Sequence, residues 1–241
     1  MDMQFINKAL ERTNFNLKTQ DFKTTAHKSE IQFLFNTHFF PKFDIKQKAI
    51  NSFEEDTLNK LIDALRSESP QNFQKIYRYP LPHLGPGEVV FYFLINNAIL
   101  GGSDKGDLTV GGQKYEIKSV RVSADRFVSK FFLGGTVPLG SLVSKIEQLK
   151  IKHKLPGDKA TEINKSTIDQ IRKLSPDEFN QIEQEFADTA YNYYFKDMNV
   201  VFLNNESQSK LGQIEASGKV GKDQIKIELV TRQTIKPMVK I

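Results

Sequence analysis

An acid, a pair of glycines, and then an acid and a lysine two residues apart occur together in residues 106–120, GDLTVGGQKYEIKSV. Side chains two residues apart on a β-strand project to the same face, so Glu116 and Lys118 share a face if this stretch is extended. A two-residue turn at the glycines places Asp107 near Glu116 on the partner strand. Two carboxylates a few ångströms apart repel each other unless a cation joins them. The spacing therefore predicts a cation site with oxygen ligands, which favours Mg²⁺ or Mn²⁺ over zinc.

Three predicted elements would position these side chains. The paired glycines predict a hairpin with strands over 107–110 and 114–122. The segment 85–100 opens with Gly-Pro-Gly-Glu and stops at a second glycine pair, which predicts a buried helix with Glu88 in its first turn. An apolar period close to 3.6 residues predicts a further helix over 43–66.

The same patterns suggest how the whole chain is organised. We expect an N-terminal helical extension over 1–80 and an α/β domain over 81–241. Within that domain, amphipathic and strand-like stretches predict a helical segment over 139–195 and C-terminal strands over 199–241.

The helix-borne glutamate, Gly106-Asp107 and Glu116-Ile117-Lys118 together resemble the PD-(D/E)xK nuclease superfamily, whose fold is called restriction-endonuclease-like. The resemblance covers roughly residues 85–120 and looks most similar to phage-encoded members. Gly106 stands where the named motif has proline. The resemblance implies an α/β fold with a mixed central β-sheet flanked by helices.

The resemblance also implies roles for these residues. Asp107 and Glu116 would bind Mg²⁺ together with the backbone carbonyl of Ile117, and Glu88 would complete the shell. Lys118 would orient or deprotonate the attacking water. The implied activity is that of a Mg²⁺-dependent deoxyribonuclease, in our interpretation an endonuclease, acting on DNA phosphodiester bonds.

Each of these residues also has an interpretation without catalysis. Glu116 and Lys118 can form an ion pair on a solvated sheet face, worth about 1 kcal/mol or less. Asp107 can be a turn residue, and Glu88 a first-turn acid favoured by the helix dipole. We favour the catalytic interpretation because these alternatives would all have to hold independently.

For the whole chain, the main alternative is a non-catalytic protein that retains the nuclease fold, either a phage virion or assembly component or a DNA-binding structural protein. A sequence-specific restriction enzyme is a third possibility, with its specificity in the flanking regions. No GxxxxGK[ST] phosphate loop occurs, which argues against an ATP-driven motor.

Charge gives a weaker indication of the partner. The 241 residues carry a formal net charge of +5, with a pI of about 9.1, which suits a polyanion such as DNA. Arg121 and Arg126 follow the lysine-bearing strand, and Lys145 and Lys152 occupy polar positions of a predicted helix. We predict that these four side chains contact DNA phosphates, with solvated surface charge as the alternative.

The remaining composition limits the kind of site and the compartment. The chain contains no cysteine, which excludes a disulfide framework and thiolate metal ligands. Its longest apolar run, 89–95, is too short to span a membrane. We therefore expect a cytoplasmic protein without a membrane partner, or a virion-associated one if it is phage-encoded. Homo-oligomers and phage assembly partners are both compatible with the sequence.

Overall fold

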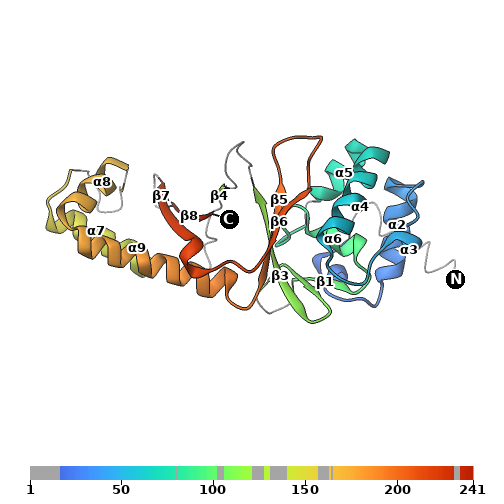
Figure 1. Cartoon of the computed structure of the whole chain (residues 1–241), viewed down its shortest axis with the longest axis horizontal. Coiled ribbons are helices and arrows are strands. Elements are labelled where there is room, and N and C mark those ends of the chain that lie inside the picture. Colours follow the sequence, from blue (N-terminus) through green and yellow to red (C-terminus); the bar gives the residue numbers. More distant parts are fainter. Residues whose placement is uncertain are drawn as a thin grey trace. The chain divides into compact units, whose positions relative to one another are not determined.

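The computed structural model describes residues 17–79, 81–101, 106–120, 128–130, 140–156, 163, 165–230 and 234–240. The chain is a mixed α/β protein that divides into two compact units (Figure 1). Unit 1 comprises Met1–Val120 with Asp197–Gly218, and unit 2 comprises Arg121–Lys196 with Lys219–Ile241.

Short helices make up most of the N-terminal part of unit 1. They are η1 (Thr19–Phe22), α2 (Lys28–Phe39), α3 (Ile45–Lys48), α4 (Glu55–Glu68), α5 (Pro70–Tyr77) and α6 (Glu88–Leu94). α5 starts where the Ser69 hydroxyl accepts a hydrogen bond from the Asn72 N–H and Pro70 takes the first helical position. Every residue of α6 is buried, as its apolar sequence predicts.

A five-stranded mixed sheet completes unit 1, in the order β1-β2-β3-β5-β6. Its strands are β1 (Ala98–Leu100), β2 (Leu108–Val110), β3 (Gln113–Val120), β5 (Asn199–Asn204) and β6 (Ile214–Gly218). β3 and β5 are parallel, and the other neighbours are antiparallel. The parallel register places Glu116 beside Val200 and Lys118 beside Phe202. The mixed central sheet predicted from the sequence is therefore present.

The helices before residue 80 and the hairpin share one hydrophobic core. Phe22 and Phe35 belong to the same buried cluster as Tyr92 of α6 and Ile117 of β3. Unit 1 therefore includes residues on both sides of position 80. The physical reason is that the apolar faces of these short helices are buried against α6 and the sheet.

One predicted helix is interrupted and another is shorter than expected. The helix predicted over 43–66 is broken between α3 and α4, where Ile50 forms a parallel bridge with Ile95. The Ile50 N–H donates to the Leu94 carbonyl at 3.0 Å, and the Asn96 N–H donates to the Ile50 carbonyl at 2.8 Å. These tertiary hydrogen bonds also end α6 at Leu94, so the last part of segment 85–100 forms β1 instead of helix.

In its described residues, unit 2 contains three α-helices and a small antiparallel sheet. The helices are α7 (Gly140–Lys152), α8 (Lys165–Leu174) and α9 (Pro176–Ala190), followed by the π-helical turn η2 (Tyr191–Phe195) and the short η3 (Lys222–Gln224). The sheet has the order β4-β8-β7, with β4 (Val128–Lys130), β8 (Thr234–Lys240) and β7 (Ile225–Val230). The predicted C-terminal strands are thus divided between the two units. No helix in the described part of the chain is both long and apolar enough to cross a membrane.

Candidate active site

The hairpin of β2 and β3 has the predicted two-glycine turn. Gly111 and Gly112 have φ angles of +57° and +83°, a backbone conformation that glycine adopts without steric cost. At the open end, the Asp107 N–H donates to the Tyr115 carbonyl at 2.9 Å. The Ile117 N–H donates in turn to Asp107 Oδ2 at 2.8 Å. Asp107 is therefore fixed to the backbone on both sides of Glu116.

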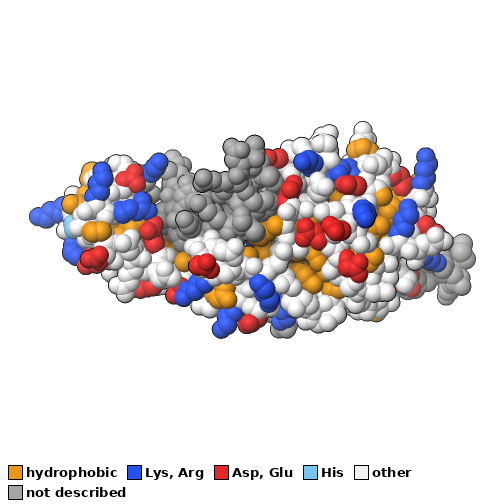
Figure 2. All heavy atoms as spheres, in the orientation of Figure 1, with side chains coloured by type: hydrophobic (Ala, Val, Ile, Leu, Met, Phe, Trp, Pro, Cys, Tyr) orange, Lys and Arg blue, Asp and Glu red, His pale blue; other side chains and the backbone are white. Residues whose placement is uncertain are grey.

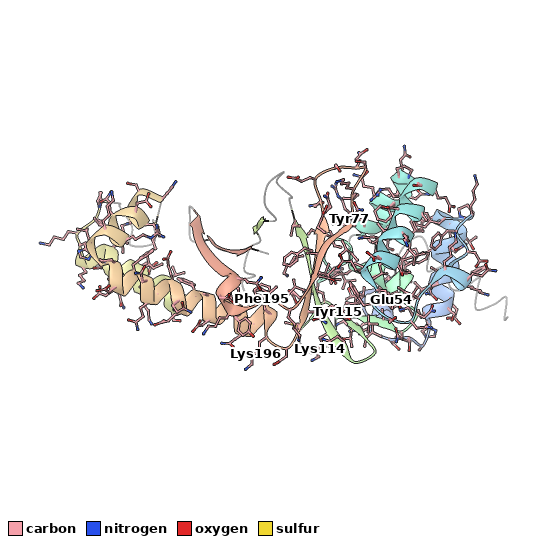
Figure 3. All side chains as sticks on the ribbon, viewed as in Figure 1. Glu54, Tyr77, Lys114, Tyr115, Phe195 and Lys196 are labelled. Carbon is pink, nitrogen blue, oxygen red and sulfur yellow. The ribbon has the colours of Figure 1, made fainter. Side chains whose placement is uncertain are left out.

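Strand β3 separates an apolar face from a charged one, as its period of two predicts. Tyr115, which is labelled in Figure 3, stacks on Phe53 with ring centroids 4.5 Å apart, and Ile117 lies in the core. On the opposite face, Lys118 Nζ donates to Glu116 Oε1 at 2.5 Å. Glu116 is 5% exposed and the Lys118 side chain is 18% exposed, so this ion pair is largely buried.

Glu88 is placed by a tightly packed turn at the start of α6. The Gly85 N–H donates to Glu88 Oε1 at 2.5 Å, and the Gly87 N–H donates to the Tyr77 carbonyl at 2.7 Å. Gly87 has a φ of +91°, and a Cβ atom there would lie 2.4 Å from Leu203 Cδ1. A side chain at this position would displace the turn, so glycine is required here. The turn leaves the Glu88 carboxylate 4% exposed.

Electrostatics show that the structure brings four of the predicted side chains together. Burial, and then the Asp107 carboxylate, raise the pKa of Glu88 to about 9, while Lys118 opposes this shift. Burial, and then Asp107, also raise the pKa of Glu116 to about 7 against the effect of Lys118. Burial raises the pKa of Asp107, whereas Lys118 and the Ile117 N–H lower it. The charge of Lys118 thus acts on all three acidic side chains, and Lys118 contacts Glu116 directly.

The chemistry of these donors fits a hard divalent cation, because three carboxylates and the Ile117 carbonyl are oxygen ligands. In the structure, however, these carboxylates are already engaged by other protein groups. Each carboxylate has a protein donor: Gly85 for Glu88, Ile117 for Asp107 and Lys118 for Glu116. Among the described residues, no three Asp, Glu or His side chains are grouped so that they could hold a metal ion. A cation would have to replace Lys118 as the partner of Glu116.

The predicted arginine contacts to DNA, Arg121 and Arg126, lie outside the described residues. On the face shown in Figure 2, the Lys and Arg side chains of the described residues are interspersed with Asp and Glu. This face therefore offers several separate cationic positions in place of one uniform basic surface.

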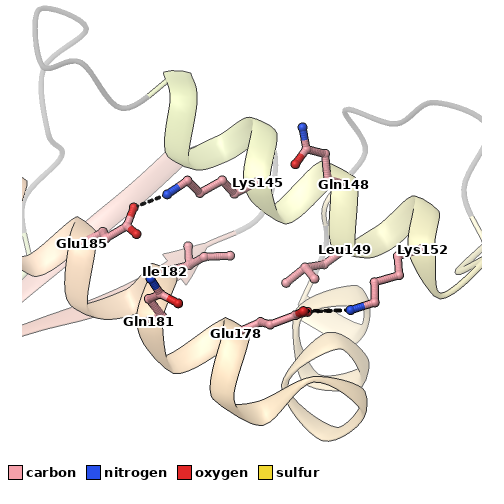
Figure 4. Close-up of a pocket in the computed structure, with 8 residues that line it drawn as sticks. All are labelled: Lys145, Gln148, Leu149, Lys152, Glu178, Gln181, Ile182 and Glu185. Atoms are coloured by element: carbon pink, nitrogen blue, oxygen red, sulfur yellow. Dashed lines mark hydrogen bonds and ion pairs between the residues drawn. The ribbon is translucent and has the colours of Figure 1, made fainter.

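Lys145 and Lys152 lie on α7 in unit 2 and have acidic partners on α9 (Figure 4). Lys145 Nζ is 2.5 Å from Glu185 Oε2, and Lys152 Nζ is 2.8 Å from Glu178 Oε1. These four side chains line a groove between the two helices. Pairing with carboxylates reduces the charge that either lysine offers to a phosphate, so contact with DNA remains a prediction for them.

Two hydroxyl groups near the cluster were not predicted. The Tyr77 and Ser119 hydroxyls are 2.9 Å apart, and Ser119 Oγ lies 3.4 Å from the Pro86 carbonyl. Tyr77 therefore contacts the Glu88 turn through its backbone and reaches β3 through its side chain (Figure 3). The sequence offers one signal for this contact: Ser119 is a polar residue on the apolar face of β3.

Comparisons of the chain with protein-family models, with curated proteins and with solved structures found no match. Its function must therefore be argued from the geometry and charge of the Glu88, Asp107, Glu116 and Lys118 cluster.

Proposed function

We propose that this protein is a divalent-metal-dependent nuclease that hydrolyses DNA phosphodiester bonds at the cluster of Glu88, Asp107, Glu116 and Lys118. The observation that supports this most is the mutual electrostatic influence of three largely buried carboxylates and one lysine. Burying excess negative charge is costly, and such clusters with perturbed pKa values are concentrated at functional sites. A cation bound there would offset the excess charge.

In this proposal, Asp107 and Glu116 provide carboxylate oxygens, Ile117 its backbone carbonyl, and Glu88 the fourth ligand. Bound Mg²⁺ or Mn²⁺ would supply a Lewis acid and lower the pKa of a water molecule. Lys118, no longer paired with Glu116, would orient or deprotonate the attacking water and offset charge on the phosphate. The fold that goes with this proposal is the restriction-endonuclease-like fold of the PD-(D/E)xK superfamily.

The closed Glu116–Lys118 ion pair favours a second candidate, a non-catalytic DNA-binding or phage assembly protein that retains the nuclease fold. In such a protein Lys118 would neutralise Glu116 permanently. Calorimetric titration with Mn²⁺ distinguishes the two candidates. Binding that is lost in Asp107→Asn supports the nuclease, and absence of binding to the wild type supports the second candidate.

The direct test is cleavage of linear, supercoiled, nicked and single-stranded DNA with Mg²⁺ or Mn²⁺. We expect the wild type to cut at least one of these substrates and EDTA to abolish cutting. Asp107→Asn keeps an oxygen for the Ile117 N–H, and Lys118→Met keeps an apolar stem, so both should fold. Each should lower the rate by about 100-fold or more, as removing one electrostatic contact to the transition state does.

Lys60→Gln is the matched control, because Lys60 is an exposed lysine on α4 of the same unit. It should cut at the wild-type rate. Failure of the wild type to cut any of the four substrates would refute the proposal. Undiminished cutting by both Asp107→Asn and Lys118→Met would show that the site has been assigned to the wrong residues.

A further inference from the structure

A groove of about 540 Å³ lies in unit 1 between α2, α3 and the residues that follow α6. Its lining includes Gln32, Phe33 and Asn36 of α2, Lys42 and Asp44 before α3, Lys46 of α3, and Asn96. The groove contains no member of the catalytic cluster. It combines polar, aromatic and cationic side chains with one acidic side chain, all within one unit of the chain.

Hydrogen bonds fix the orientation of the Gln32 side-chain amide. Its Nε2 donates to the Phe93 carbonyl at 3.0 Å and to Asn96 Oδ1 at 3.3 Å. The Phe93 carbonyl accepts only, and Asn96 Nδ2 is used on the Ala49 carbonyl. The Gln32 nitrogen must therefore face these acceptors, which leaves its oxygen on the other side. Gln32 is 9% exposed, and its Oε1 has no donor among the described residues.

Asn36 presents the complementary group one helical turn further along α2. Its Oδ1 accepts the Ile45 N–H at 3.2 Å, so its Nδ2 hydrogens remain available. Residues four apart on a helix are neighbours on one face. The groove therefore offers a hydrogen-bond acceptor on Gln32 beside a hydrogen-bond donor on Asn36. Every nucleobase carries a donor and an acceptor next to each other on its Watson–Crick edge, and that pair matches this arrangement.

An aromatic ring and two ammonium groups accompany this pair. Phe33 is one of the large apolar side chains that remain exposed, at 37%. Lys42 and Lys46 are exposed lining residues, and no ion pair to a described residue is formed by either ammonium group. Two carboxylates lie nearby: Asp44 also lines the groove and accepts the Gln47 N–H, and Glu68 Oε1 accepts the Lys42 backbone N–H at 2.8 Å. An exposed ring with cations beside it is the combination by which proteins hold unpaired bases and their phosphates.

We propose that this groove binds an unpaired nucleotide of a single-stranded DNA segment. The base stacks on Phe33 and bonds to Gln32 and Asn36, while Lys42 and Lys46 contact flanking phosphates. A peptide backbone would satisfy the amides equally well, but it would leave the two lysines without anionic partners. The choice of DNA as the ligand rests on the proposed nuclease function.

The groove lies at the opposite end of α6 from Glu88. Seven helical residues span on the order of 10 Å, about three base steps of a DNA strand. A strand held in the groove is thus within a short distance of the proposed catalytic cluster. The inference therefore predicts that the substrate carries a single-stranded segment.

Fluorescence anisotropy with labelled dT12 tests the groove in EDTA, where cleavage does not occur. We expect Phe33→Ser to weaken binding at least fivefold, as loss of one stacked base does. The double variant Lys42→Gln, Lys46→Gln should weaken binding and lower the slope of log K against log salt by about 1.4, since each phosphate contact on a single strand contributes about 0.7. The control Lys60→Gln, Lys75→Gln removes two exposed lysines from α4 and α5 and should have less effect.

The outcomes separate this inference from the nuclease proposal. Wild-type dT12 affinity in Phe33→Ser, or equal losses in the groove and control doubles, would overturn the inference even if the protein cuts DNA. Weaker binding confined to the groove variants would support it even if no cutting occurs. An acidic octapeptide that binds in a Phe33-dependent way, with no dT12 binding, would assign the groove to peptides and refute the inference.

Discussion

Glu88→Gln should make the metal-free protein more stable than the wild type at neutral and mildly alkaline pH. Burial beside Asp107 raises the pKa of Glu88 to about 9 from an ordinary value of 4.5. A carboxyl group whose pKa is raised by folding contributes stability that is complete below about pH 4.5 and is lost as the pH rises toward 9. Glutamine keeps an oxygen for the Gly85 N–H but cannot ionise, so the variant lacks this loss.

The size of the effect follows from the shift. Between pH 4.5 and 9 the Glu88 carboxyl group is ionised in the unfolded chain but protonated in the folded one. The free energy of unfolding of the wild type therefore falls by about 1.4 kcal/mol per pH unit, or about 4 kcal/mol from pH 5 to pH 8. Glu88 is 4% exposed, and solvent therefore screens little of this energy. The difference in the free energy of unfolding between Glu88→Gln and the wild type should therefore increase by up to about 4 kcal/mol from pH 5 to pH 8.

Urea unfolding in EDTA at pH 5, 6.5 and 8 measures this difference. Glu206→Gln is the matched control, because Glu206 is an exposed glutamate of the same unit, and its difference from the wild type should stay near zero. If the difference for Glu88→Gln stays constant with pH, the Glu88 carboxyl group does not share an electrostatic site with Asp107 and Glu116. A variant that is less stable than the wild type at pH 8 would refute the reasoning as well.

Two further predictions concern stability in unit 1. Gly87→Ala should lower the free energy of unfolding by about 2–4 kcal/mol in urea titrations, because a Cβ atom would overlap Leu203 at a φ of +91°. Gly112→Ala, with a φ of +83° but open space around it, should cost only about 1 kcal/mol, and equal losses would contradict the steric argument. Burial lowers the pKa of Lys28 to about 7, so between pH 7 and 9 the unfolded chain binds more protons than the folded one. Raising the pH over that range should stabilise the wild type relative to Lys28→Met by about 2–3 kcal/mol, and a pH-independent difference in thermal unfolding would show that Lys28 keeps its ordinary pKa.

Local pattern is sufficient to predict the hairpin and the position of Glu88. The Gly111-Gly112 pair needs left-handed φ angles that few other residues adopt, and the period of two places Glu116 and Lys118 on one face. Likewise, Gly85, Pro86 and Gly87 indicate from local sequence alone that a helix begins at Glu88. These features depend on residues close together in the chain, so the sequence alone carries them.

Features that depend on distant partners could not be predicted. β3 pairs in parallel with β5, about 80 residues further along the chain, and neither strand's sequence indicates which strand it pairs with. The helix predicted over 43–66 is interrupted because Ile50 bonds to the backbone around Ile95. Lys152 looked available for phosphate from its place on α7, but its acidic partner Glu178 comes from another helix. Periodicity shows which face of a helix or strand is apolar or charged, but it does not show which other residues that face contacts.

Anomalous diffraction from crystals soaked in Mn²⁺ tests the central claim most directly. The account predicts a peak within about 2.0–2.3 Å of carboxylate oxygens from both Asp107 and Glu116, with Lys118 Nζ displaced from Glu116. No peak at the cluster, with Glu116 still paired to Lys118 and Asp107 still bonded to Ile117, would contradict it.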